Sequence, residues 1–140
     1  MRDLELSLKA AADPTRTRIL KLLEARGLCV CQVQAVLGLA PSTVSKHLAI
    51  LKLAGLVEDQ RNGKWVVYTL ACEPNHYARA VLGLLRGPLN RDPAVIADAK
   101  RLREVLAVPL EEICSLPPAR VPGMVRARPR RVGRKEPRHA

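Results

Sequence analysis

The first part of the chain places hydrophobic residues with the period of an α-helix. Leu4, Leu8 and Ala11 recur at i, i+4 and i+7, which predicts a short amphipathic helix near the N-terminus. An Asp-Pro pair then supplies an N-cap and a residue favoured at the first helical position. We therefore expect a second helix over residues 14–26, ending at Gly27.

Two further helices follow, separated by a short turn that contains glycine. The first is expected over residues 30–37, and the second begins at Pro41. In the second helix Val44, Leu48 and Leu51 share one face. The hydroxyl and basic residues between them therefore face outward.

The period changes to that of β-strands after residue 55. Residues 56–60 and 64–70 are expected to be strands, and the second is rich in β-branched and aromatic residues. The Asn62-Gly63 pair between them is typical of a hairpin turn, because both residues tolerate positive φ. We therefore predict a β-hairpin.

The rest of the chain is divided by Gly, Pro and Asp-Pro signals. Helices are expected over residues 75–85 and 93–107, with a last short turn or helix over 109–114. Residues 117–140 are rich in Pro and Arg with few apolar side chains, so we expect a disordered basic tail. The domain prediction is thus one folded unit over residues 1–116 and this tail.

A helix, a short turn and a helix with a polar outer face form the helix-turn-helix pattern, whose second helix enters the DNA major groove. A hairpin directly after it indicates a winged helix-turn-helix, a mainly α fold with a small β-hairpin wing. The candidate DNA-binding residues lie on that helix and at the hairpin tip: Ser42, Thr43, Ser45, Lys46, His47, Arg61 and Lys64. Two alternatives stay open: the polar face is only a solvated surface, or His47 packs against the preceding helix.

Charge narrows the choice of partner. The net charge is +11, and residues 119–140 hold +7 of it, with eight Lys or Arg residues against one Glu. This charge fits a polyanion such as DNA, or an anionic membrane surface. No apolar run approaches the roughly 18–20 residues of a membrane span, and the N-terminus does not resemble a signal peptide. We expect a soluble, cytoplasmic protein with no membrane partner.

The chain has four cysteines, which in a reducing compartment are more plausible as buried thiols, metal ligands or redox sensors than as structural disulfides. Cys29 and Cys31 lie where the third helix begins, and thiolates are soft ligands for As(III), Sb(III), Cd(II), Pb(II) or Zn(II). Residues i and i+2 of a regular helix point about 200° apart, so one ion reaches both only if the helix start is irregular or unwinds. The alternative is two small buried hydrophobic residues.

The segment LCVCQVQAVLGLAPSTVSKHLAILKLAGLVEDQRNGKWVVYTL, residues 28–70, resembles the core of the ArsR/SmtB repressors. The Cys-Val-Cys box, the STVSKHL recognition helix and the GKWVVY wing strand carry the resemblance, which extends more loosely over residues 13–86. It implies a homodimer that binds operator DNA and releases it on binding a metal or metalloid. It also implies dimerisation through the first helix and the helix over 75–85, by the apolar residues Leu4, Leu8, Val81, Leu82 and Leu85.

The chain departs from the arsenic-responsive members at one position. Those members often carry a third Cys three residues after the second, where this chain has Gln34. A third thiolate must then come from Cys114 or Cys72, of the same or the partner subunit, or two thiolates suffice. The first hypothesis is As(III) or Sb(III) bound by Cys29, Cys31 and Cys114, with Cys72 as the other candidate.

Other functions have less support in the sequence. Glu73 with His76 does not supply the zinc ligand set that other family members carry on the dimer helix. A sensor of Cd(II), Pb(II) or Zn(II) and a redox or reactive-sulfur repressor that forms a disulfide are the alternatives within the class. No catalytic or phosphate-binding constellation accompanies the cysteines, so an enzyme is not expected. A nucleic-acid compaction protein would show little sequence preference, whereas the predicted recognition helix and wing indicate an inverted-repeat operator.

Overall fold

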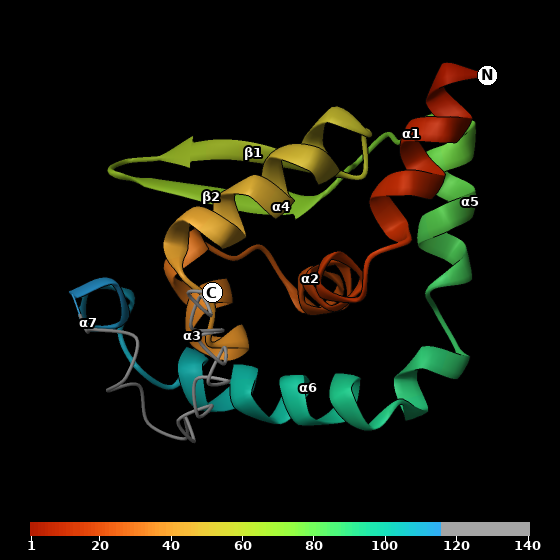
Figure 1. Cartoon of the computed structure of the whole chain (residues 1–140). Coiled ribbons are helices and arrows are strands. Elements are labelled where there is room, and N and C mark those ends of the chain that lie inside the picture. Colours follow the sequence, from red (N-terminus) through yellow and green to blue (C-terminus); the bar gives the residue numbers. More distant parts are fainter. Residues whose placement is uncertain (116–140) are drawn as a thin grey trace, which may run out of the picture.

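A computed structural model describes residues 1–115 and shows a mainly helical fold with a two-stranded sheet (Figure 1). The tail predicted to be disordered lies outside the described residues. Among residues 1–115, no helix has the length and apolar character to cross a membrane. In chain order the elements are α1 (Arg2–Ala11), α2 (Pro14–Ala25), α3 (Val30–Leu37), α4 (Pro41–Leu53), β1 (Val57–Asn62), β2 (Trp65–Leu70), α5 (His76–Leu84), the 3₁₀ helix η1 (Pro88–Arg91), α6 (Pro93–Leu106) and α7 (Leu110–Ser115).

The helix-turn-helix consists of α3 and α4, as the sequence predicts. α3 ends at Gly38, whose φ of 69° is the left-handed conformation that glycine adopts without strain. Pro41 begins α4, and Val44, Leu48 and Leu51 on its inner face are fully buried. With the apolar residues of α2 they form an aliphatic core that fixes the orientation of α4.

The wing is the antiparallel hairpin of β1 and β2, whose register runs from Val57 opposite Leu70 to Asn62 opposite Trp65. The turn lies one residue later than predicted. Asn62 remains in the strand, and the turn consists of Gly63 and Lys64. Only the glycine has positive φ (61°), the arrangement of type II′ turns, so the left-handed conformation falls on the residue that adopts it without strain.

β2 also pairs with the segment that leads into α3. The Leu28 amide donates to the Tyr68 carbonyl at 2.9 Å, and the Tyr68 amide donates to the Leu28 carbonyl at 2.8 Å. Gly27 permits this approach, because a Cβ atom there would lie 2.7 Å from Cγ1 of Val67 and 3.0 Å from Cγ2 of Thr69. The wing is thereby joined directly to the start of the helix-turn-helix.

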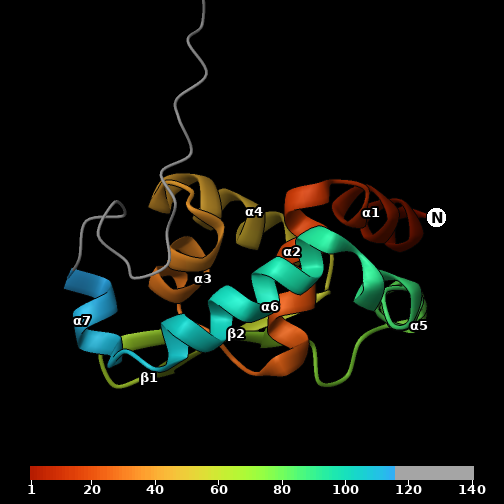
Figure 2. The same cartoon turned by 90° about the horizontal axis from the view of Figure 1, so that it is seen from below.

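The helices after the wing lead the chain back to α3. α5 packs against α1, and η1 connects α5 to α6. α6 runs beneath α2 and α3, and α7 follows beside α3, as seen from below in Figure 2. α7, the last described helix, therefore lies next to α3 in space although the two helices are far apart in the sequence.

The apolar surface on α1 and α5 differs from the predicted one. Val81, Leu82 and Leu85 were expected at a dimer surface, but they are at most 8% exposed because they face the core of their own subunit. The large apolar residues exposed on these helices include Leu8 (52%) and Leu84 (76%). The sequence periodicity identified the helices but not which side of α5 is covered by its own subunit.

Candidate nucleic-acid interface and thiol cluster

The outer face of α4 carries the residues predicted to contact DNA. Ser42, Ser45 and Lys46 are exposed and Thr43 is half-buried. α4 contains no acidic residue, and within residues 1–115 Lys46 forms no ion pair. The face therefore presents hydroxyl groups and an unpaired cation, which suit hydrogen bonds to base edges and phosphates.

The tip of the wing carries the other two predicted cations, Arg61 and Lys64, and both are exposed. Lys64 has two neighbours. Its ammonium nitrogen lies 4.9 Å from the centre of the Trp65 ring and 3.3 Å from Oε1 of Glu111 in α7. The wing tip is thus in contact with the helix that follows α6.

His47 is half-buried on the side of α4 that faces the junction of α1 and α2. Its Nδ1 lies 3.3 Å from Nη1 of Arg16, and the guanidinium also donates through Nε to the Ala10 carbonyl at 2.7 Å. Since a guanidinium only donates, Nδ1 of His47 accepts and the ring is oriented by this contact. A DNA contact by His47 stays a prediction.

Cys29 precedes α3 rather than lying in its first turn. It is the N-cap residue, with extended backbone angles of φ −83° and ψ 160°, and its amide donates to Oε1 of Gln32 at 2.9 Å. Cys31 lies in the first turn and is half-buried, whereas Cys29 is 5% exposed. Cys29 therefore lies just outside the regular helix, and the opposed directions expected of i and i+2 within a helix do not apply.

Cys114 of α7 completes a cluster of three thiols. Burial, a hydrogen bond with Cys31 and the proximity of negative charge on Cys31 and Cys29 raise the pKa of Cys114 to about 12, although Lys64 acts in the opposite direction. Burial, followed by the proximity of Cys31, also raises the pKa of Cys29. Both Cys29 and Cys114 are thus protonated at neutral pH, and a bound ion would have to replace their protons.

The three thiols are neighbours rather than a preformed metal site. Among residues 1–115, no three His, Cys, Asp or Glu side chains are already arranged to hold a metal ion. An open groove of about 620 Å³ reaches Cys29 from solvent, between the hairpin and the link from α6 to α7. An ion would need side-chain rotation or a shift of α7 to gather the three thiols, because Cys29 is buried and Cys31 and Cys114 are half-buried.

Comparison with known proteins places the chain in a family. The pattern of the arsR family of bacterial regulatory proteins matches residues 13–59, which include α2 to α4 and the first residues of β1. The arsenic resistance transcriptional regulator ArsR1 of Pseudomonas putida is 37% identical over 99 residues, 69% of this chain and 75% of that protein. The chain belongs to the ArsR family of transcriptional regulators.

Two other proteins are also similar to this chain. The transcriptional regulator CmtR of Mycobacterium bovis is 47% identical over 85 residues, 60% of this chain and 70% of CmtR. The solved structure of reduced HlyU from Vibrio cholerae has a TM-score of 0.52 at 33% identity and covers 60% of this chain and 85% of HlyU. The winged helix-turn-helix fold and a DNA-binding role follow from this membership.

Cys72, the other candidate for a third ligand in this ArsR-family chain, is not part of the thiol cluster. It is exposed, and its amide donates to Oε1 of Glu58 at 2.6 Å. The segment from β2 to α5 that contains it lies on the opposite side of the molecule from α7 in both views (Figures 1 and 2). Within one subunit, Cys114 is therefore the thiol that accompanies the Cys-Val-Cys box.

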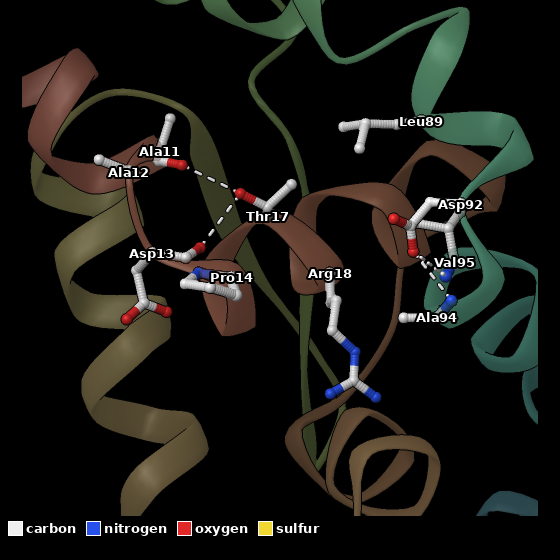
Figure 3. Close-up of a pocket in the computed structure, with 10 residues that line it drawn as sticks. All are labelled: Ala11, Ala12, Asp13, Pro14, Thr17, Arg18, Leu89, Asp92, Ala94 and Val95. Atoms are coloured by element: carbon white, nitrogen blue, oxygen red, sulfur yellow. Dashed lines mark hydrogen bonds between the residues drawn. The ribbon is translucent and has the colours of Figure 1, made fainter.

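A second hollow, of about 420 Å³, lies where the α1–α2 turn meets η1 and the start of α6 (Figure 3). Its polar groups already have partners. Asp13 accepts from the Arg16 amide, Asp92 accepts from the amides of Ala94 and Val95, and Thr17 donates to the Ala11 carbonyl. These contacts cap α2 and α6, so the polar side chains of this hollow are already hydrogen-bonded within the subunit.

The arrangement of α6 depends on charged residues that sequence reasoning missed. Asp98 is 3% exposed and accepts two hydrogen bonds from Arg18 of α2, both at 2.7 Å. The hydrogen bond with Asp98 raises the pKa of Arg18, so the guanidinium stays charged. The sequence did contain a sign of this buried charge. Asp98 occupies the i position of an i, i+4, i+7 stripe with Leu102 and Val105, where an apolar residue is normally expected.

Proposed function

We propose that this ArsR-family protein is a homodimeric transcriptional repressor that releases its operator when As(III) or Sb(III) binds to Cys29, Cys31 and Cys114. In the DNA-bound form α4 enters the major groove with Ser42, Thr43, Ser45, Lys46 and His47 toward the bases and backbone. Arg61 and Lys64 of the wing neutralise phosphates beside it. Two subunits present two recognition helices, which suits an inverted repeat.

The observation that carries this proposal is that α7, which holds Cys114, packs against α3, at whose start Cys29 and Cys31 lie. α3 is joined to the recognition helix by the three-residue turn at 38–40, so a change at its first turn is passed directly to α4. Drawing the three thiols together around a bound ion would change the angle between α3 and α4. Ion binding favours the DNA-free form of the repressor to the extent that this change weakens the DNA contacts of α4.

The chemistry of the cluster suits a trivalent metalloid. Arsenous acid reacts with three thiols to give three As–S bonds and three waters, so each thiol proton leaves as part of a water molecule. The raised pKa values of Cys29 and Cys114 do not oppose this exchange, whereas Cd(II), Pb(II) or Zn(II) must release the protons to solvent. The P. putida relative is named for arsenic resistance, which agrees with this choice.

Dimerisation is supported by apolar residues that the subunit itself leaves uncovered. Leu8 on α1 and Leu84 on α5 are mostly exposed, although α1 and α5 pack against each other. Large exposed apolar side chains on adjacent helices are typical of an interface between subunits. A symmetric dimer through α1 and α5 would cover them and leave α4 free for DNA.

A redox repressor is the second candidate, because α7, which carries Cys114, packs against α3, which carries Cys31. A disulfide between them would form with the loss of two electrons and two protons to an oxidant such as hydrogen peroxide, which is reduced to two waters. The high pKa of Cys114 disfavours this reaction, since the thiolate is the reactive species.

Operator release measured against a panel of arsenite, antimonite, Cd(II), Pb(II), Zn(II) and peroxide separates these functions. We expect arsenite and antimonite to release operator DNA at concentrations close to that of the protein. Release by peroxide alone, reversed by dithiothreitol, would replace the metalloid proposal by the redox one. No release by any of them would contradict both.

A further inference from the structure

Cys114 lies outside the segment that matches the family pattern, and α6 determines where it is placed. α6 runs from the side of the molecule that carries α5 to the side that carries α3, and three residues then link it to α7 (Figure 2). Any rotation or sliding of α6 would therefore move Cys114 relative to Cys31. A residue is displaced by about 1.5 Å along the axis and about 100° around it for each step of helical register.

The contact that fixes α6 against α2 is the ion pair between Arg18 and Asp98. Nε and Nη2 of the guanidinium each lie 2.7 Å from a different oxygen of the carboxylate, which gives a two-point contact with a defined orientation. The Asp98 side chain is 4% exposed and the Arg18 side chain 31%. A buried carboxylate is strongly unfavourable without its partner, so other registers of α6 are disfavoured.

Two more polar contacts fasten the same region to the subunit's own α2 and α3. Arg101 Nη1 donates to the Val36 carbonyl near the end of α3 at 3.3 Å. The buried ammonium of Lys21 donates to the Leu85 carbonyl at 3.1 Å and to Oδ1 of Asn90 at 2.8 Å, which holds the chain just before α6.

We propose that Arg18 and Asp98 are positioning residues for the thiol site, and that they dock α6 so that each subunit supplies all three thiolates from its own chain. This inference rests on the proposed function and specifies how the site is assembled. A buried ion pair contributes little net stability compared with apolar residues of similar size, but it selects one arrangement. Here the selected arrangement is the one that brings Cys114 to the Cys-Val-Cys box.

The first test replaces Asp98 by Asn and titrates the dimer with arsenite, following the near-ultraviolet absorption of arsenic–thiolate bonds. We expect affinity for arsenite to fall, by at most the roughly 10- to 100-fold typical of residues that hydrogen-bond a ligand directly, because Asp98 acts on Cys114 only through α6. Operator affinity in the absence of arsenite should stay within twofold, because α4 and the wing keep their own contacts. Glu104→Gln, which changes an exposed carboxylate on the same helix, is the matched control and should leave both quantities unchanged.

The second test does not depend on the stability of the Asp98 variant. Heterodimers are prepared from one subunit with Cys29→Ser and Cys31→Ser and one with Cys114→Ser. If the site lies within one chain, the heterodimer contains no complete set and binds arsenite no more tightly than the Cys114→Ser homodimer. Recovery of one site of wild-type affinity per heterodimer would overturn the inference, because it requires thiolates from two chains.

The outcomes also distinguish this inference from the proposed function. If the wild-type protein does not bind arsenite, the proposed function is wrong. If it binds arsenite through three thiolates but Asp98→Asn and wild type have equal affinity, only the positioning role is wrong. If Asp98→Asn fails to fold, Arg18→Asp combined with Asp98→Arg restores a pair of opposite charges, and we expect arsenite affinity to recover with the fold.

Discussion

The ammonium group of Lys64 lies 3.3 Å from the carboxylate of Glu111, so the tip of the wing touches the helix that carries Cys114. Lys64 is a candidate phosphate ligand, and Glu111 competes with DNA for it. Both side chains are largely exposed, so this competition is weak and depends on salt. The contact nevertheless joins the wing, which is proposed to bind DNA, to α7, which carries a proposed inducer ligand.

Replacing Glu111 by Gln should strengthen operator binding slightly. The expected gain is a few-fold at low salt and should vanish at high salt, because it reflects a single screened charge. Fluorescence anisotropy with operator DNA over a range of salt concentrations measures it. Glu112→Gln, beside it in the chain and with no ion pair within residues 1–115, is the control. Weaker binding by the Glu111 variant would show that α7 supports the wing rather than competing with DNA.

Replacing Lys46 or Arg61 by Ala should weaken operator binding and reduce its dependence on salt. Each lost phosphate contact is expected to remove roughly one unit from the slope of log affinity against log salt concentration. Arg103→Ala, which removes an exposed cation of α6, is the control for net charge. Unchanged slopes for both Lys46 and Arg61 variants would contradict the docking proposed for α4 and the wing.

Asp13→Ala should lower the free energy of unfolding by about 1 kcal/mol at pH 7, because the side chain caps α2 by accepting from the Arg16 amide. That hydrogen bond holds the pKa of Asp13 below its ordinary value. The folded state therefore gains stability from the charged form above the ordinary pKa of about 3.9 and loses it as pH falls through the folded pKa. Asp13→Asn keeps a cap without a charge, so its difference from wild type should shrink as the pH falls through the lowered folded-state pKa of Asp13.

The response to pH should differ between arsenite and Cd(II). The pKa of Cys114 is raised to about 12 and that of Cys29 is also raised, so the free protein keeps both protons across the neutral range. Cd(II) affinity should rise by up to about tenfold per pH unit for each proton released, whereas arsenite affinity should change little, because its thiol protons leave as water. Titrations at about pH 6 and about pH 8 test this difference. Equal slopes for the two ions would contradict the protonated state of the cluster.

Local signals predicted much of the fold. Asp13-Pro14 and Asp92-Pro93 mark the starts of α2 and α6, and Asn75 caps α5, because a capping side chain acts within its own first turn. η1 was not predicted, since Gly87 and Pro88 were interpreted only as a break. The hairpin turn was misplaced by one residue, because cross-strand pairing at Asn62 outweighs the local preference of Asn-Gly.

Two features of the structure depend on packing between distant segments and could not be predicted from local sequence patterns. Asp98 occupies an apolar position of α6, and only the partner on α2 explains why a charge is tolerated there. Cys114 was proposed as a ligand because it was an extra thiol, but no spacing rule connects it with Cys31. Its position beside Cys31 depends on the docking of α6, while its role as a ligand stays a prediction.

Under the proposed function, the three clustered thiols couple metalloid binding to release of DNA. The most direct measurement is operator release by arsenite for Cys29→Ser, Cys31→Ser and Cys114→Ser, with the exposed Cys72→Ser as the control. We expect all four variants to bind operator as wild type does, since none of these residues lies on the outer face of α4. The Cys72 variant should release DNA at the wild-type arsenite concentration, the Cys29 and Cys31 variants should fail to release it, and the Cys114 variant should need more arsenite. A full wild-type response from the Cys29 and Cys31 variants would contradict the account and leave a repressor with a different signal.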